Sequence, residues 1–252
     1  MIDRPAPAPS LSVLVIQPDE DDPLDLFEPW LRDEGLTVRC IRPYAGDPVP
    51  ARVDEAALMV LGGDMGVHDR QAHPWLIDIE RLLSQAVADG TPTLGICLGG
   101  QLLASSEGGT VDRGPHGMEV GTPMLRPRPE VEDDELLGAV LWPARFASMH
   151  RDAILALPPN AIWLVESERY KHQAFRIGDR AWGVQFHPEV SLERFTSWAD
   201  HEEDDPDTIS RIEAGVRQLA VASSEVVAAA EPMARRFARI VRASQTQLTG
   251  KS

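Results

Sequence analysis

Short apolar runs alternate with amphipathic stretches over the first hundred residues of the chain. The apolar runs are rich in β-branched residues and too short for helices, so each predicts a buried strand. The stretches between them carry apolar residues at helical spacing, and Gly35 and Gly90 are placed to end two of the helices. The predicted strands cover Leu11–Ile16, Leu36–Ile41, Ala56–Leu61 and Thr91–Ile96, and the predicted helices cover Leu24–Glu34, Pro74–Ala88 and Gln101–Ser106.

This alternation predicts an α/β fold. Strands joined by helices at short spacing form right-handed crossovers, so we expect an open, mostly parallel sheet with helices on both faces. After Gly108 the pattern changes to strands without long helices between them, which predicts a small antiparallel extension or an extra sheet. These later strand stretches are Val111–Leu125, Arg145–Met149, Ile162–Glu166, Gln173–Ile177 and Ala181–Phe186.

The last part of the chain, residues 191–247, has a helical pattern again. Apolar positions from Val226 to Val241 recur at roughly helical spacing, with Arg235, Arg236, Arg239 and Arg242 interleaved as a solvated face. The acidic run Glu202–Asp207 is interpreted as a solvated turn. We therefore expect a flexible N-terminal arm at 1–10, one domain over 11–205, and a C-terminal helical extension over 206–252 packed on that domain.

Composition and charge exclude several classes of function. The 252 residues include 40 Asp and Glu against 24 Lys and Arg, a net charge of −16, which argues against a nucleic-acid binder. The sequence has neither an apolar stretch of transmembrane length nor an apolar signal region, so we expect no membrane partner. The two cysteines are too few for a disulfide framework, which favours a cytoplasmic location. The histidines are scattered and no cysteine pair has ligand spacing, so no metal site is predicted.

The sharpest chemical signal is Gly95-Ile-Cys97-Leu-Gly99, between an apolar strand and the start of a helix. This is the nucleophile-elbow pattern, in which a tight turn requires small residues two positions before and after the nucleophile. The helix N-terminus favours the thiolate form of Cys97, and the N–H of Leu98 can face a developing oxyanion. The alternative is a buried structural cysteine beside packing glycines.

A thiol nucleophile needs a base, and His187 has the most suitable setting among the seven histidines. It ends an apolar run and precedes Pro188, which places it at the carboxyl edge of the sheet, where ligands bind in open α/β folds. Glu189 can reach the second ring nitrogen and fix the tautomer. The alternatives are a strand-end histidine with a satisfied hydrogen bond, and a Glu189 that is solvated or caps a helix beginning near Ser191.

At these residues the sequence resembles a class I glutamine amidotransferase, a stand-alone one similar to the glutaminase domain of GMP synthase. The resemblance covers about residues 11–200 and implies a flavodoxin-like sheet. The matching segments, in order, are Leu61–Asp69, Pro74–Leu76, Gly95–Ala104 and Ala181–Glu189.

The resemblance implies a role for each matching residue. Cys97 attacks the carboxamide carbon of L-glutamine and forms a γ-glutamyl thioester, His187 transfers the protons, and Glu189 orients His187. The backbone N–H groups of Gly63 and Leu98 form the oxyanion hole. Gln101 contacts the bound glutamine. The segment Ser148-Met149-His150 falls where relatives bind the α-amino and α-carboxylate groups through backbone. No cofactor is implied.

The sequence also departs from the family pattern. Gly100 stands where many relatives have a larger residue, which predicts a wider pocket floor or a looser helix start. Met149-His150-Arg151-Asp152 differs from the pattern of relatives, which leaves recognition of the α-substituents open. No Walker-type loop occurs, and only about 50 residues follow position 200, so we expect ammonia to pass to a separate synthetase subunit or to be released.

Two other functions stay open at this point. The same chemistry would serve a hydrolase of another γ-glutamyl amide or peptide, because only the leaving group differs. A non-catalytic regulatory or binding module on the same fold is the alternative of another class. The oligomeric state does not follow from the sequence.

Overall fold

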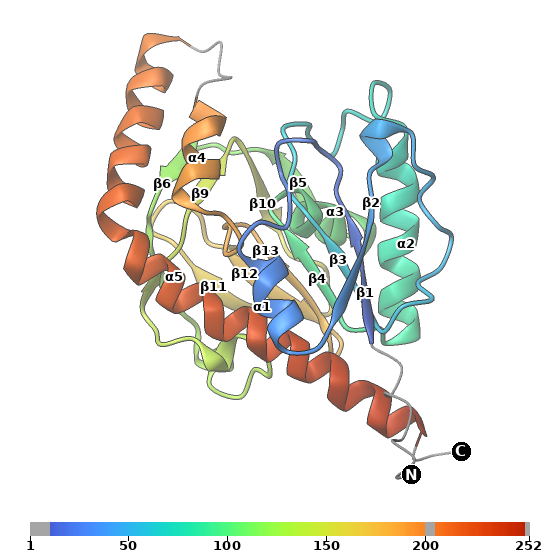
Figure 1. Cartoon of the computed structure of the whole chain (residues 1–252). Helices are drawn as coiled ribbons and strands as arrows, with labels where there is room; N and C mark the ends of the chain where they lie inside the picture. Colours follow the sequence, from blue (N-terminus) through green and yellow to red (C-terminus); the bar gives the residue numbers. More distant parts are fainter. Residues whose placement is uncertain (1–10, 200–204, 250–252) are drawn as a thin grey trace, which may run out of the picture.

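A nine-stranded sheet forms the centre of the molecule, in the order β2-β1-β3-β4-β13-β12-β11-β7-β8 (Figure 1). The structure is a computed structural model and describes residues 11–199 and 205–249. The first five strands of this order are parallel, and the remaining four pair antiparallel, so the predicted mostly parallel α/β sheet with an antiparallel extension is confirmed. The parallel strands are β1 (Ser12–Ile16), β2 (Thr37–Ile41), β3 (Ala57–Val60), β4 (Thr93–Ile96) and β13 (Ala181–Val184). The antiparallel strands are β12 (Ala174–Ile177), β11 (Ala161–Glu166), β7 (Met124–Pro127) and β8 (Ala144–Arg145).

Helices cover both faces of the sheet, as the alternating sequence pattern predicts. In β1, Val13 and Val15 belong to the core under α1 and α5, whereas Leu14 and Ile16 belong to the core under α2 and α3. Successive side chains of a strand point to opposite faces, so this strand of apolar residues is buried on both sides. The covering helices are α1 (Phe27–Asp33) and α5 (Pro206–Thr249) on one face, and α2 (Trp75–Asp89) and α3 (Leu98–Ser106) on the other.

The region after Gly108 is more divided than the sequence predicts. The stretch Val111–Leu125 is broken into three strands, where glycines with positive φ, Gly117 and Gly121, turn the chain. The stretch Arg145–Met149 is divided between two strands, β8 and β9 (Ser148–His150). The strand β10 (Asp152–Ala156) was not predicted. It pairs with β5 (Thr110–Arg113), and β6 (Glu119–Gly121) pairs with β9, so two small sheets stand beside the main one. Short 3-10 turns lie at Pro43–Ala45, Pro129–Val131 and Leu137–Ala139.

The C-terminal residues are helical, as predicted, in α4 (Leu192–Ala199) and the long α5. Figure 1 shows α5 running beside α4, bending, and crossing to α1. The arginines of this helix are not simply solvated, as the pattern suggested: Arg235, Arg239 and Arg242 all form ion pairs with Glu34, just after α1. These contacts and the apolar residues of α5 hold the helix against the domain.

Some of the expectations fall outside the described residues. The predicted arm at 1–10 and the first half of the acidic run at 202–207 lie there, and the domain boundaries stay predictions. Among the helices of residues 11–199 and 205–249, none combines the length and the apolar character needed to cross a membrane.

Candidate active site

Cys97 lies on a sharp turn between β4 and α3. Its φ of 49° is in the left-handed region, which is unusual for a residue with a side chain. The neighbouring glycines are required sterically: a Cβ on Gly95 would lie 2.4 Å from the carbonyl oxygen of Gly99, and one on Gly99 would lie 2.1 Å from that of Val60. The backbone geometry is therefore that of a nucleophile elbow, and the strain is confined to the residue that carries the thiol.

Gly100 does not widen the pocket floor, contrary to the expectation from the sequence. A Cβ at this position would lie 2.7 Å from the carbonyl oxygen of Val184, in the strand next to the elbow. The missing side chain thus allows α3 to pack closely on β13, and the residue faces that strand rather than the pocket.

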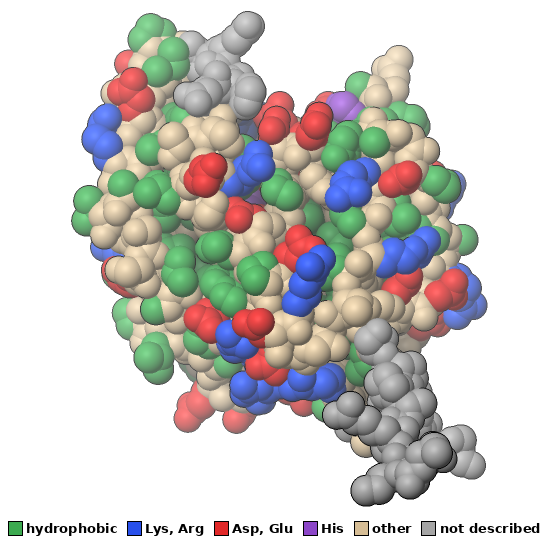
Figure 2. Space-filling model, in the orientation of Figure 1, with side chains coloured by type: hydrophobic (Ala, Val, Ile, Leu, Met, Phe, Trp, Pro, Cys, Tyr) green, Lys and Arg blue, Asp and Glu red, His purple; other side chains and the backbone are tan. Residues whose placement is uncertain are grey.

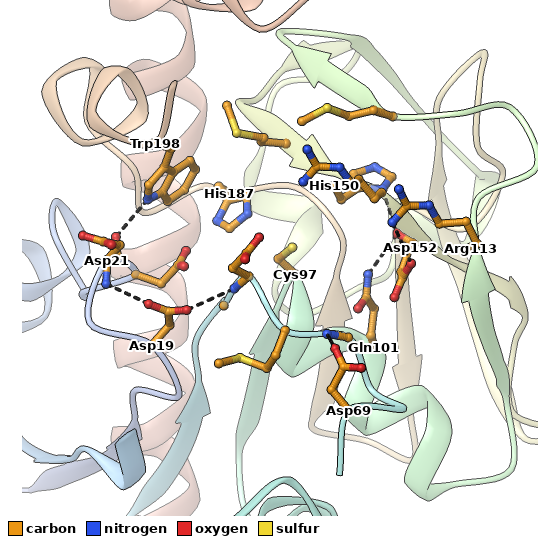
Figure 3. A pocket seen from close by; sticks show the side chains of 18 of the residues that line it. Asp19, Asp21, Asp69, Cys97, Gln101, Arg113, His150, Asp152, His187 and Trp198 are labelled. Carbon is orange, nitrogen blue, oxygen red and sulfur yellow. Dashed lines mark hydrogen bonds and ion pairs between the residues drawn. The ribbon is translucent and has the colours of Figure 1, made fainter. Parts of the chain in front are cut away.

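His187 and Glu189 follow β13 and lie buried beside the elbow. The ring nitrogen Nδ1 donates a hydrogen bond to Oε1 of Glu189 at 2.8 Å, and both side chains are only 2–3% exposed. The backbone N–H of His187 bonds to the carbonyl of Ala147, which fixes the position of the residue. Figure 3 shows the ring next to the Cys97 side chain. The helix α4 is capped by Ser191, whose hydroxyl accepts the N–H of Arg194, so Glu189 is not needed as its cap.

The electrostatics of this group favour a protonated imidazole. Burial acts to lower the pKa of His187, but the Glu189 carboxylate, the Cys97 charge and the hydrogen bonds to both residues together hold this pKa well above 6.5. The ring can therefore keep a proton at neutral pH beside the sulfur atom. A group in this state can pass a proton to a departing nitrogen.

Two glutamines connect Cys97 to the small sheets. The side-chain amide of Gln185 donates to the Cys97 sulfur at 3.6 Å, and Gln101 Nε2 donates to Gln185 Oε1 at 3.2 Å and to the Asp152 carbonyl at 3.0 Å. Gln101 thus lines the pocket with its nitrogen held by the protein, and its contact with bound glutamine stays a prediction. The contact from Gln185 was not predicted, although this residue stands two positions before His187.

Met149 and His150 also line the pocket. Both ring nitrogens of His150 are used inside the protein, by the carbonyl of Asp152 at 2.9 Å and by Oε2 of Glu119 at 3.2 Å. The side chain of His150 is thus part of the scaffold, and the backbone at this residue is left to meet a ligand.

Gly63 and Leu98, the predicted oxyanion donors, lie next to each other. A Cβ on Gly63 would be 3.0 Å from a methyl group of Leu98, although the two residues belong to different turns. Leu98 is the first residue of α3, where N–H groups have no acceptor within the helix. The turn after β3 and the start of α3 therefore meet beside the thiol.

Asp22 is a residue of this site that the sequence analysis missed. It is 8% exposed, and its carboxylate lies within 4.8 Å of ligand-type atoms of both His187 and Glu189. Burial raises the pKa of Asp22 to about 7; His187 opposes the shift, and Glu189 and two other aspartates add to it. The available signal was the acidic run at the carboxyl end of the first strand. These three side chains have ligand-type geometry, but His187 and Glu189 already bond to each other.

These residues meet in a pocket of about 730 Å³ at the carboxyl ends of the parallel strands. Figure 2 shows acidic side chains at the rim of a hollow at the top of the molecule. In Figure 3, Asp19, Asp21 and Trp198 lie on one side of His187, and Gln101, His150 and Arg113 lie on the other. Trp198 was also not predicted: its ring packs edge-on against His187 at 4.8 Å between centroids.

Comparison with known proteins decides the family. The family profile described as Glutamine amidotransferase class-I matches residues 32–200. The chain belongs to this family.

Individual class I glutamine amidotransferases and related proteins support the assignment. A glutamine-hydrolysing GMP synthase subunit from Natronomonas pharaonis is 34% identical over 164 residues, 64% of this chain and 79% of that one. Gamma-glutamyl peptidase 3 of Arabidopsis thaliana is 32% identical over 125 residues, 47% of this chain and 49% of that one. The crystal structure of a glutamine amidotransferase from Thermotoga maritima superposes with a TM-score of 0.79 at 26% identity, covering 92% of this chain and 98% of that one.

Proposed function

We propose that this amidotransferase hydrolyses the side-chain amide of L-glutamine through a thioester on Cys97. The observation that carries the proposal is the strained elbow, which holds the Cys97 thiol beside a buried His187–Glu189 pair. A structural cysteine would need neither the left-handed backbone nor a charged partner. The combination is the arrangement that nucleophilic catalysis by a thiol requires.

Each residue contributes to a defined step. The sulfur of Cys97 adds to the amide carbon while the N–H groups of Gly63 and Leu98 stabilise the oxyanion. The carbon–nitrogen bond breaks, and the departing nitrogen takes a proton from His187, which Glu189 keeps oriented. Water then attacks the thioester and gives one proton to His187, and the collapse of this intermediate releases glutamate, a proton and the Cys97 thiolate.

The wall that carries Gln101 suits the glutamate half of the substrate. Arg113 and Asp152 on this wall form a loose ion pair with 3.8 Å between the charged atoms. A substrate with an α-carboxylate and an α-ammonium group can interact with both charges, and the backbone at Met149 and His150 adds polar groups. These residues are the proposed α-substituent site.

The family comparisons support a partner protein. One relative is named as a subunit of GMP synthase, so we propose that a separate synthetase subunit receives the ammonia. Cys40 and Cys97 are both free thiols, which is consistent with a reducing compartment such as the cytoplasm.

The test is glutamate release from L-glutamine by the wild-type chain and by Cys97→Ala. Hydroxylamine added during turnover should trap the thioester as γ-glutamyl hydroxamate in the wild type alone. The matched control is Cys40→Ala, which removes the other thiol and should leave turnover and trapping intact. A Cys97 thiol that reacts neither with substrate nor with a glutamine-like alkylating reagent would instead support a non-catalytic module.

A second candidate is the hydrolysis of a substituted γ-glutamyl amide or peptide. The pocket is large for glutamine alone, at about 730 Å³, and one relative is named as a γ-glutamyl peptidase. The thioester chemistry is the same, so the two candidates differ only in the amine that leaves.

A further inference from the structure

The side of the pocket beyond His187 is strongly acidic. We call it the acidic lobe: it consists of Asp19, Asp21, Asp22, Asp64 and Trp198, all lining the pocket. Asp19 Oδ2 accepts the backbone N–H of Asp64 at 3.2 Å, and the indole of Trp198 donates to the carbonyl of Asp21 at 2.8 Å. These bonds gather the carboxylates and the aromatic ring on one side of the reacting groups.

The carboxylates of the acidic lobe have little cationic compensation. Asp21 has an ion pair with Arg194 at 3.7 Å. In residues 11–199 and 205–249, no Lys or Arg forms an ion pair with Asp19, Asp22 or Asp64. Arg113, which also lines the pocket, lies on the opposite side of His187 (Figure 3).

Asp22 shows that this is more than a solvated acidic surface. It is more than nine-tenths buried, lines the pocket, and has no hydrogen-bond donor among the described residues. Burial makes the ionised form of this carboxyl group costly, and a ligand that carries a positive charge would stabilise the ionised form. The face of Trp198 adds a second interaction that favours ammonium groups.

The acidic lobe lies where the leaving amine must pass. Asp22 is within 4.8 Å of His187, the group that protonates the amine, and a Cβ on Gly63 would be 3.3 Å from Asp19 Cβ. If the glutamyl half occupies the wall of Gln101, the amine half must point to the other side of His187. A short alkyl chain is long enough to reach these carboxylates.

Resting on the proposed function, we propose that the preferred substrate is a γ-glutamyl amide whose amine half carries a second, cationic amino group. The Asp19, Asp22 and Asp64 carboxylates bind this ammonium group. In the reaction, the Cys97 sulfur bonds to the carbonyl carbon of the γ-glutamyl amide, the carbon–nitrogen bond breaks, and the amide nitrogen takes a proton from His187. The products after hydrolysis are glutamate and a diamine.

The experiment measures binding to the Cys97→Ala chain, which cannot consume the ligand. The three ligands are the γ-glutamyl amides of 1,4-diaminobutane, n-pentylamine and 4-aminobutyrate, which have similar length and cationic, neutral and anionic ends. Titration calorimetry should give a dissociation constant about tenfold lower for the cationic amide than for the neutral one. Because exposed charges are screened, about 0.5 M NaCl should reduce this preference at least about threefold.

A pair of variants in the same background locates the effect. Asp64→Asn should reduce the preference for the cationic amide about threefold, since one charge of the lobe is lost. Glu20→Gln is the matched control: it removes the same charge from an exposed residue on the neighbouring loop that does not line the pocket, and the preference should stay. Circular dichroism confirms that each variant is folded.

The remaining outcomes overturn the proposal. Equal binding of the cationic and neutral amides, tighter binding of the anionic amide, or no binding of any of them would do so. A preference that survives Asp64→Asn would place the ammonium group elsewhere. A failure of the proposed function looks different: the preference is present, but the wild type releases no glutamate from the amide.

Discussion

Two histidines that line the same pocket, His150 and His187, each bond to a buried glutamate, and the two pairs differ in how completely the protein surrounds them. Where β6 pairs with β9, His150 bonds to Glu119, and the carboxylate oxygens of Glu119 also accept bonds from Ser167 and Gln173. At the end of β13, His187 bonds to Glu189, but Oε2 of Glu189 has no hydrogen-bond partner among residues 11–199 and 205–249. The other side of the His187 ring faces Cys97.

This difference distinguishes a structural pair, His150 and Glu119, from a pair suited to catalysis, His187 and Glu189. Both nitrogens of the His150 ring are engaged within the protein, whereas His187 keeps one nitrogen for the nucleophile. A histidine beside a carboxylate is thus insufficient to indicate catalysis. The pair proposed to be catalytic differs because the surrounding protein does not use all of its polar atoms: one nitrogen of His187 faces the Cys97 sulfur.

The strongest test of the different roles of the two pairs is to replace each histidine in turn. His187→Gln should lower kcat/KM for the best γ-glutamyl substrate about 1,000-fold, because proton transfer to the leaving nitrogen is lost. His150→Gln should lower it less than about tenfold after correction for the folded fraction. Steady-state kinetics with both variants checks this, and equal losses would show that the two pairs act together.

The second prediction concerns stability. Glu119→Ala leaves His150, Ser167 and Gln173 without their shared acceptor, and should lower the free energy of unfolding by about 3 kcal/mol. The control Glu130→Ala, at an exposed position, should change it by less than about 0.5 kcal/mol. Urea denaturation measures both, and a Glu119→Ala value as small as the control would contradict the structural role.

The third prediction uses the pH dependence of stability. Since the pKa of Asp22 rises from 3.8 to about 7 on folding, the folded protein binds more protons than the unfolded chain between these values. Its stability must therefore fall as pH rises through this window. Between pH 5 and pH 8, the free energy of unfolding of Asp22→Asn should therefore fall by about 2 to 3 kcal/mol less than that of the wild type.

Urea denaturation at pH 5 and pH 8 tests this, with Glu20→Gln as the control that should follow the wild type at both values. An Asp22→Asn variant that loses as much stability as the wild type would show that Asp22 has an ordinary pKa.

The smallest expected effect concerns Glu189 and tests what its negative charge contributes to activity. Glu189→Gln keeps a hydrogen-bond acceptor for His187 but removes the negative charge, so kcat/KM should fall about 10- to 30-fold. Because Glu189 helps to raise the pKa of His187, the alkaline decline of activity should move to lower pH. A pH–rate profile that is lower but unshifted would limit Glu189 to a purely steric role.

The sequence predicts the parts of this molecule that local pattern determines. The strands from Leu11 to Ile96 and the elbow at Cys97 follow from apolar runs and from glycines that leave no space for a Cβ. The antiparallel half is less predictable: three short strands stand in the stretch Val111–Leu125, because glycine turns rather than hydrophobic periodicity divide it.

The site shows the same division. Cys97, His187 and Glu189 have a recognisable local context, and the structure brings them together. Asp22 and Trp198 have no such local context. Asp22 belongs to the site because it lies near His187 and Glu189, and Trp198 because it bonds to Asp21, and both contacts join residues more than 150 positions apart. Trp198, on α4, also packs against His187. His150 shows a further limit: Glu119, 31 positions away, engages its side chain, a contact that the local sequence does not indicate, while substrate binding through the backbone of this segment stays a prediction.

The left-handed backbone at Cys97 also has a consequence for how this protein can evolve. A side chain held in such a conformation costs about 1 to 3 kcal/mol, which the packing of β4 and α3 must offset. Glycine at this position would relieve the cost and abolish the nucleophile. Stability and activity therefore conflict at this position, because the single substitution Cys97→Gly would give a more stable protein without its nucleophile.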